Sequence, residues 1–227
     1  MGLVKISKLT FSFLEELKQN NEWAWFTQNK PLYLQVSGDI MNFADSLLKE
    51  LNKHDVIETP SGAKSQYRIY RDVRFSLDKM PYNTYLGGRF KRAGKERRGG
   101  YYYHFEPGNK SFLSGDFWRP NAHDLRLIRD DIAFNPKRLT EIINSDTFTE
   151  YFGVLRGEQL KNIPRGFEKT HEAADLLRYK QFLVRRKFTD EQVLSSEFLL
   201  LASDTIKEMR PFLDYMSEVL SIDANGR

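Results

Sequence analysis

Cysteine is absent from the 227 residues of this chain. Its absence excludes disulfide bonds, thiolate nucleophiles, cysteine-ligated zinc and iron–sulfur clusters in one step. A reducing compartment is compatible with such a composition, and we expect a cytoplasmic protein. No metal site and no cofactor is predicted.

Long apolar runs are also missing. No window approaches the roughly 18 apolar residues that a membrane-spanning helix requires. The first residues lack the apolar stretch and the small-residue cleavage site of a secretory signal. We therefore expect no membrane partner.

Three common catalytic signatures do not occur in the chain. There is no phosphate-binding P-loop, no glycine-rich dinucleotide fingerprint and no nucleophile elbow. The common nucleotide hydrolases and α/β-hydrolases are therefore poor models for this protein. The sequence assigns no catalytic residue, and it leaves open whether the protein is an enzyme.

What the chain does contain is an ordinary globular mixture with many aromatic side chains. Hydrophobic residues make up 40% of it, charged residues 29% and aromatic residues 14%. A chain of this length buries enough surface to form one core without metal or disulfide staples, so a single domain over residues 1–227 is predicted. The net charge of +4 weakly favours anionic partners.

The hydrophobic pattern changes its period along the chain. After Pro31, apolar residues recur every three or four positions up to Leu51, which predicts a long helix. From Ile69 to Phe75 apolar and polar residues alternate, which is typical of a strand with one buried face. Further segments predicted as strands are 82–92, 99–106, 111–118, 148–155 and 181–188.

Helices are expected again in the second half of the chain. Asn121 is a good helix cap, Pro136 suits a first helical turn, and a long helix over 196–220 is expected to kink at Pro211. The pattern as a whole predicts an α+β protein. Its mostly antiparallel central sheet is packed by the N-terminal and C-terminal helices.

The densest group of charges follows the first predicted turn. Four cations and two carboxylates lie within twelve residues, namely Arg68, Arg71, Asp72, Arg74, Asp78 and Lys79. Strand alternation puts Arg71 on the same face as Ile69, Val73 and Phe75. A cation there must be paired or held for an anion, because an isolated buried charge is costly.

This run, Arg-x-x-Arg-Asp-x-Arg-Phe-x-x-Asp-Lys-x-Pro-Tyr from Arg68 to Tyr82, resembles the signature of a conserved-hypothetical family. That family, domain of unknown function 2461, occurs in bacteria and fungi. The resemblance covers nearly the whole sequence, including Trp25-Phe26-x-x-x-Lys30 and Pro164-Arg165-Gly166-Phe167. It implies a bacterial protein of similar length, and it brings no established activity, substrate or cofactor.

Two interpretations of the run stay open. In the first it binds the phosphate or carboxylate of a small ligand, because arginine forks match such groups. The candidate ligand-binding residues are Arg68, Arg71, Arg74, Lys79 and Tyr82, and the weak catalytic candidates are Asp72, Asp78 and His104. In the second it is a structural hub, in which Arg71 pairs with Asp78 and Arg74 with Asp72.

The basic loop, residues 89–98, supports an alternative function. Together with the tyrosines that follow, it predicts a nucleic-acid or protein interaction module in which cations hold phosphates and rings stack on bases. Its candidate residues are Lys95, Arg97, Arg98, Tyr101, Tyr102 and Tyr103. The competing interpretation is a solvated, flexible hairpin loop.

Overall fold

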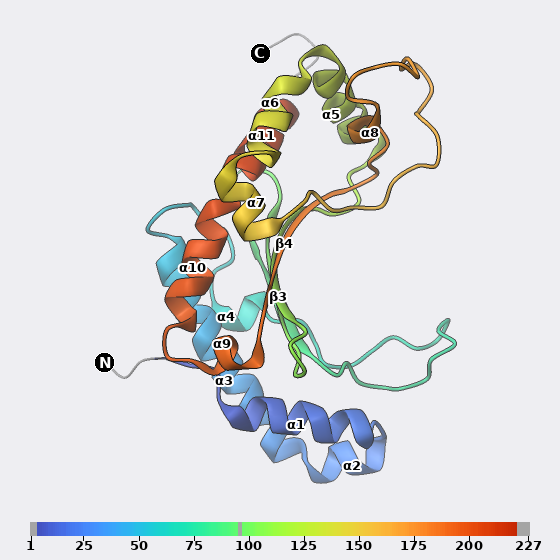
Figure 1. The fold of residues 1–227 in the computed structure, drawn as a ribbon. Coiled ribbons are helices and arrows are strands. Elements are labelled where there is room, and N and C mark those ends of the chain that lie inside the picture. Colours follow the sequence, from blue (N-terminus) through green and yellow to red (C-terminus); the bar gives the residue numbers. More distant parts are fainter. Residues whose placement is uncertain (1–3, 95–96, 222–227) are drawn as a thin grey trace. The chain divides into compact units, whose positions relative to one another are not determined.

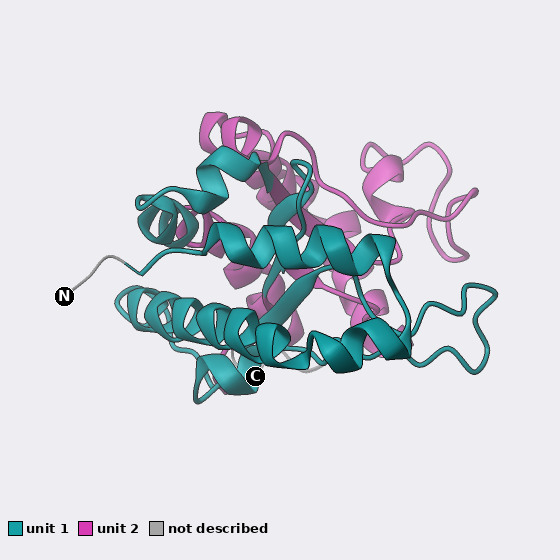
Figure 2. Ribbon diagram, turned by 90° about the horizontal axis from the view of Figure 1, so that it is seen from below, with its two compact units in different colours: residues 1–90, 102–113, 187–204 teal, residues 91–101, 114–186, 205–227 magenta. Residues whose placement is uncertain are grey.

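The computed structural model describes residues 4–94 and 97–221. These residues divide into two compact units, which Figure 2 shows in different colours. Of the described residues, unit 1 comprises 4–90, 102–113 and 187–204, and unit 2 comprises those within 91–101, 114–186 and 205–221. Each unit is thus assembled from three separate stretches of chain.

Four strands form one sheet among the described residues (Figure 1). They are β1 (Leu86–Lys91), β2 (Gly100–Phe105), β3 (Ser111–Phe117) and β4 (Phe182–Phe188), and they neighbour one another in that order. All four confirm strands that the sequence pattern predicts. An antiparallel sheet combined with long helices confirms the α+β class.

The helices of unit 1 begin the chain. They are α1 (Lys8–Gln19), α2 (Trp23–Gln28), α3 (Lys30–Leu51) and α4 (Gly62–Ser65), followed much later by α9 (Asp190–Leu194) and the first part of α10 (Phe198–Glu208). The helix predicted after Pro31 is confirmed as α3, which has proline in its first turn. Its apolar stripe is buried and includes Phe43, whose ring lies 5.6 Å from those of Phe105 and Phe198.

The helices of unit 2 follow β3. They are α5 (Ala122–Phe134), α6 (Pro136–Ile143), α7 (Asp146–Phe152), α8 (Ala174–Leu177) and α11 (Arg210–Ser221). Asn121 caps α5 by accepting a hydrogen bond from Asp124 N, as the sequence predicts. The long helix expected over 196–220 is interrupted between Glu208 and Arg210, next to Pro211, where proline cannot donate a helical hydrogen bond.

The strand predicted over 148–155 is wrong, because residues 148–152 lie in α7 and the remaining three form no strand. Ser145 caps the helix by accepting a hydrogen bond from Phe148 N. Phe148 and Phe152 are four residues apart, so the helical period places both on one buried face. A short apolar segment fits both periods, and here the cap decides in favour of the helix.

None of the helices in the described ranges 4–94 and 97–221 is both long enough and apolar enough to cross a membrane.

Tyr103 on β2 is an example of close packing in unit 1. Its ring is buried, and its hydroxyl lies 2.8 Å from Ser65 Oγ. A side chain at Gly88 would meet this ring, since a Cβ there would stand 2.3 Å from the Tyr103 hydroxyl oxygen. Burial raises the pKa of Tyr103 to about 12, and the Ser65 hydrogen bond offsets part of that shift.

The raised pKa of Tyr103 predicts a loss of stability at alkaline pH. An unfolded tyrosine ionises near pH 10, so the unfolded chain releases the phenol proton first and folding stability falls as pH rises toward 12. The full loss from this group is about 3 kcal/mol, from two pKa units. We expect urea unfolding between about pH 9 and about pH 11.5 to show a shallower decline for Tyr103→Phe than for the parent protein. Parallel declines would contradict the assignment.

Candidate functional site

The Arg–Asp run forms a hairpin that projects from unit 1 after α4 (Figure 1). We call residues 68–82 the arginine hairpin. The backbones of its two arms pair at the base, through the bridge between Tyr70 and Tyr82 and the hydrogen bond from Arg71 N to Pro81 O at 2.9 Å.

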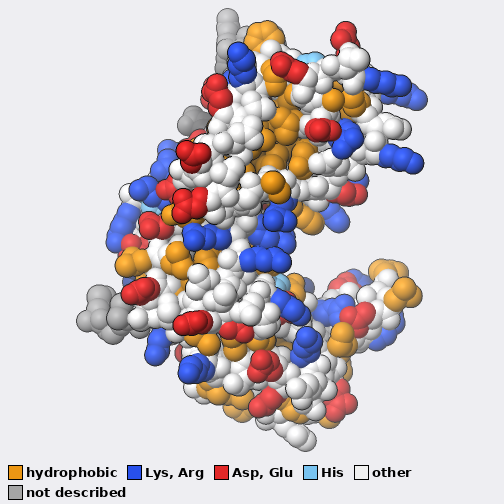
Figure 3. Space-filling model, in the orientation of Figure 1, with side chains coloured by type: hydrophobic (Ala, Val, Ile, Leu, Met, Phe, Trp, Pro, Cys, Tyr) orange, Lys and Arg blue, Asp and Glu red, His pale blue; other side chains and the backbone are white. Residues whose placement is uncertain are grey.

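The strand predicted over residues 69–75 is therefore wrong. Ile69 is buried, but Val73 is only half-buried and Phe75 is 97% exposed. Alternation predicts which residues share a face, and it does not show whether a core exists to cover that face. Figure 3 shows hydrophobic side chains at the end of this projection, where Phe75 and Leu77 are exposed.

The base of the hairpin is fixed by aromatic rings from α2. Tyr82 is 1% exposed and stacks on Phe26, with 4.0 Å between ring centroids. Asn21 accepts a hydrogen bond from Tyr82 N and donates one to Tyr82 O. The Tyr82 hydroxyl has no hydrogen-bond partner among the described residues, and burial raises its pKa. This placement gives Tyr82 the role of an anchor for the arginines around it.

Both ion pairs that the sequence predicts as a structural hub are present. Arg71 Nη1 donates to Asp78 Oδ2 at 2.7 Å and to Met80 O at 3.0 Å. Arg74 donates two hydrogen bonds to the Asp72 carboxylate, from Nε at 2.9 Å and from Nη2 at 2.6 Å. These guanidinium groups are held in fixed orientations by carboxylates of the same hairpin.

The pKa values of the two carboxyl groups are lowered by these contacts. For Asp72 the main cause is the hydrogen bond from the Arg74 side chain, and for Asp78 it is the Met80 backbone N–H, followed by Arg71. Both carboxylates are therefore ionised at neutral pH. An ionised carboxylate can orient an arginine but cannot act as a proton donor, which weakens the case for either residue as a general acid.

The two remaining cations of the hairpin are placed differently. Lys79 Nζ donates to Val73 O at 3.0 Å, which ties the tip of the hairpin together. Arg68 makes no ion pair with any carboxylate among the described residues, although its charge helps to lower the pKa of Asp72. A cavity of about 340 Å³ is lined by Arg68, Tyr70, Arg71, Asp72 and Arg74. The structure thus brings the three predicted arginines together around one cavity.

His104 lies on β2 in a chain of hydrogen bonds along one face of that strand. Its Nδ1 is 3.1 Å from the Tyr102 hydroxyl, and its Nε2 is 3.0 Å from Glu106 Oε2. Its ring stacks on Phe112 at 4.6 Å. The phenol can donate to Nδ1 while Nε2–H donates to the carboxylate, so a neutral imidazole satisfies both bonds. Both nitrogens of the proposed general base are thus engaged, one by Tyr102 on the same strand and one by Glu106 directly after it.

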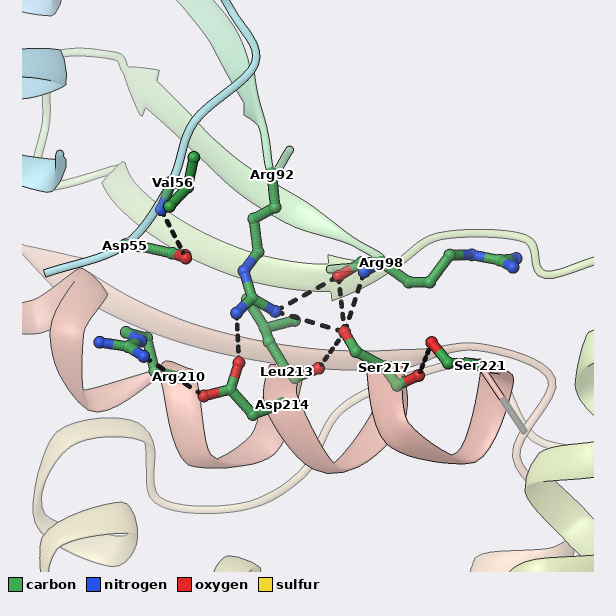
Figure 4. Close-up of polar contacts among 9 residues, drawn as sticks. All are labelled: Asp55, Val56, Arg92, Arg98, Arg210, Leu213, Asp214, Ser217 and Ser221. Carbon is green, nitrogen blue, oxygen red and sulfur yellow. Dashed lines mark hydrogen bonds and ion pairs between the residues drawn. The ribbon is translucent and has the colours of Figure 1, made fainter. Parts of the chain in front are cut away.

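The basic loop is tied to α11 in unit 2, as Figure 4 shows. Arg92 is 1% exposed and forms an ion pair with Asp214, and Arg98 N donates to Ser217 Oγ at 2.9 Å. The Arg98 guanidinium pairs with Asp124. Arg97 is exposed, whereas the predicted contact residue Lys95 lies outside the described residues. The interpretation of this loop as wholly solvated is therefore wrong for Arg92 and Arg98.

The tyrosines after the loop are mostly internal. Tyr101 and Tyr103 are buried, and Tyr102 is half-buried with its ring 6.1 Å from that of Tyr67. Exposed rings are expected for stacking on bases, so the burial of two of the three is contrary to that expectation.

Sequence reasoning missed the burial of Arg92, although a signal for it exists. Leu86, Gly88 and Phe90 occupy the buried face of β1, and the same alternation continued by one step reaches Arg92. The prediction placed Arg92 at the end of the strand over 82–92 and also in the basic loop 89–98, and it did not apply the alternation to this residue.

These features define the class of the protein: an α+β fold with an antiparallel sheet and an arginine-rich hairpin. The chain belongs to a family of conserved hypothetical proteins, DUF2461, whose model matches residues 9–215. This match confirms the resemblance stated from the sequence. The comparisons with curated proteins and with solved structures gave no match.

Proposed function

We propose that the arginine hairpin binds a small molecule through a phosphate or carboxylate group. The observation that carries the proposal is that Arg68, Arg71 and Arg74 line a single cavity of about 340 Å³. Four cations of the hairpin face only two carboxylates, so positive charge remains after the internal pairs are counted. Arginine forks suit oxyanions, because they offer parallel N–H donors.

The internal ion pairs are compatible with this role. Arg71 uses Nη1 for Asp78 and Met80, and Arg74 uses Nε and Nη2 for Asp72, so each guanidinium keeps N–H groups for a ligand. The carboxylates fix the direction of the forks before the ligand arrives. A preoriented fork loses less side-chain entropy on binding than a free one.

The nucleic-acid alternative has weaker support. Two of its three tyrosines are buried and Arg98 is paired with Asp124, which weakens the case for three of its candidate residues. The cytoplasmic location stays a prediction from the composition.

Removing the charge of Arg68 is the sharpest test of the hairpin. Arg68 is exposed and makes no ion pair among the described residues, so Arg68→Gln leaves the hairpin's own contacts intact. We expect inorganic phosphate or succinate to bind the parent protein and to bind this variant about tenfold more weakly, the effect of losing one charge-assisted hydrogen bond. Isothermal titration at constant ionic strength measures both affinities.

Lys64→Gln is the matched control, because it removes one exposed positive charge from α4 outside the cavity. Its affinity for both probes should equal that of the parent protein. Equal weakening by the two substitutions would show a general charge effect, and no binding of either probe to the parent protein would rule out the proposal for these anions.

A further inference from the structure

Arg129 on α5 is a buried cation in unit 2. The residue is 9% exposed, and its guanidinium makes one hydrogen bond, from Nη2 to Tyr179 O at 2.9 Å. Its Nε is buried without any hydrogen-bond partner. One carbonyl oxygen thus accepts from a guanidinium group that carries five N–H donors.

No carboxylate compensates this charge. Among residues 4–94 and 97–221, Arg129 forms no ion pair, whereas the neighbouring arginines Arg126 and Arg138 do. Burial lowers the pKa of Arg129, and the positive charge of Arg126 lowers it further. The neighbouring charge that acts on Arg129 therefore has the same sign. The partner of Arg126 is the exposed Asp130, 2.8 Å from its Nε.

This arrangement is costly for the fold. A buried charge without a counter-ion costs several kcal/mol, and an apolar side chain of similar size at this helix position would avoid that cost. A hydrogen bond to a single neutral carbonyl offsets only a small part of this desolvation cost. The cost is recovered if an anion from solution completes the site.

The segment that carries Gly166 and Phe167 lies against Arg126. The guanidinium of Arg126 lies over the Phe167 ring, with 4.7 Å to its centroid. Gly166 has a positive φ of 89°, and a Cβ there would stand 3.1 Å from Arg126 Nη1. The backbone of the Pro164–Arg165–Gly166–Phe167 motif therefore approaches the arginine one helical turn before Arg129.

We propose that Arg129 and Arg126 form a second oxyanion site, in unit 2, which takes a phosphate or carboxylate group beneath the segment that carries Gly166. It is built from residues other than those of the arginine hairpin and stands independently of the function proposed for the hairpin. Arg129 supplies the buried charge, and Arg126 supplies a second fork that Phe167 holds in place.

The test uses Arg129→Met on the full chain. If Arg129 is retained for an anion, removal of its uncompensated charge keeps or raises the unfolding midpoint in phosphate-free buffer, by up to a few degrees. Binding of inorganic phosphate, followed by the Nε–Hε resonance of Arg126, should be lost in this variant. A lower midpoint combined with unchanged phosphate binding would make Arg129 a structural residue and overturn the proposal.

A second variant keeps the test decisive if Arg129→Met does not fold. Arg129→Lys retains the charge but not the fork, and we expect it to bind phosphate about tenfold more weakly. Unchanged affinity would overturn the proposal. Succinate as a second probe distinguishes a carboxylate site from a phosphate site.

Phosphate binding to the Arg68→Gln and Arg129→Met variants distinguishes the two proposed anion sites. Phosphate should still shift the Arg126 resonance in Arg68→Gln, and should still bind the arginine hairpin in Arg129→Met. Binding at the hairpin alone would overturn the site at Arg129 and leave the hairpin proposal standing. Binding at Arg129 alone would overturn the hairpin proposal and leave the site at Arg129 standing.

Discussion

Replacing Phe43 by alanine should lower the free energy of unfolding by about 3–5 kcal/mol, the cost of deleting a fully buried phenyl ring. Phe43 lies on the apolar stripe of α3 and is buried. Its ring is stacked on Phe198 of α10 and meets Phe105 of β2 edge-on, both at 5.6 Å. The substitution leaves a cavity where three elements of unit 1 meet, and rigid neighbours cannot close it.

Phe75→Ala is the matched control, because it makes the same chemical change at a residue that is 97% exposed. Its effect should stay within about 0.5 kcal/mol. Urea unfolding followed by circular dichroism measures both variants, provided that the slopes are equal. A loss at Phe75 comparable to that at Phe43 would mean that the tip of the arginine hairpin is packed in solution.

The second large effect is expected at the ion pair between Arg92 and Asp214. Asp214→Ala should cost about 3 kcal/mol, at the lower end of the range for breaking a buried pair. The guanidinium of Arg92 is 1% exposed and would lose the Asp214 carboxylate, whereas the side chain of Asp214 is 47% exposed, so water can reach part of the vacated site. Ser217 and the Arg98 carbonyl remain as its neutral partners.

Two further variants sharpen this test. Asp175→Ala removes a carboxylate from an exposed pair with Arg178 and should cost a few tenths of a kcal/mol at most. Arg92→Met combined with Asp214→Ala should recover part of the loss, because no charge is then left buried. If Asp214→Ala and Asp175→Ala have the same small effect, the enclosure of Arg92 is looser than the structure shows.

The two proposed anion sites differ in how far the sequence reveals them. For the arginine hairpin, the charges of Arg71 and Asp78 are close in the chain and separated by turn-forming residues, so their pairing follows from local geometry. For Arg129 no local pattern exists. Asp130 and Asp131 follow it directly, yet they pair with Arg126 and Arg138, because neighbouring residues on a helix point in different directions.

The sequence by itself determined the elements whose signal is periodic or local. The stripe of α3, the cap at Asn121, the first-turn proline Pro136, and the hairpin of β2 and β3 are confirmed because backbone preference and side-chain spacing act within a few residues. Tertiary structure alone decided which apolar faces meet a core. Phe75 and Arg92 each continue an alternating pattern, yet Phe75 projects into solvent while Arg92 is enclosed, since burial depends on whether segments distant in the chain cover that face.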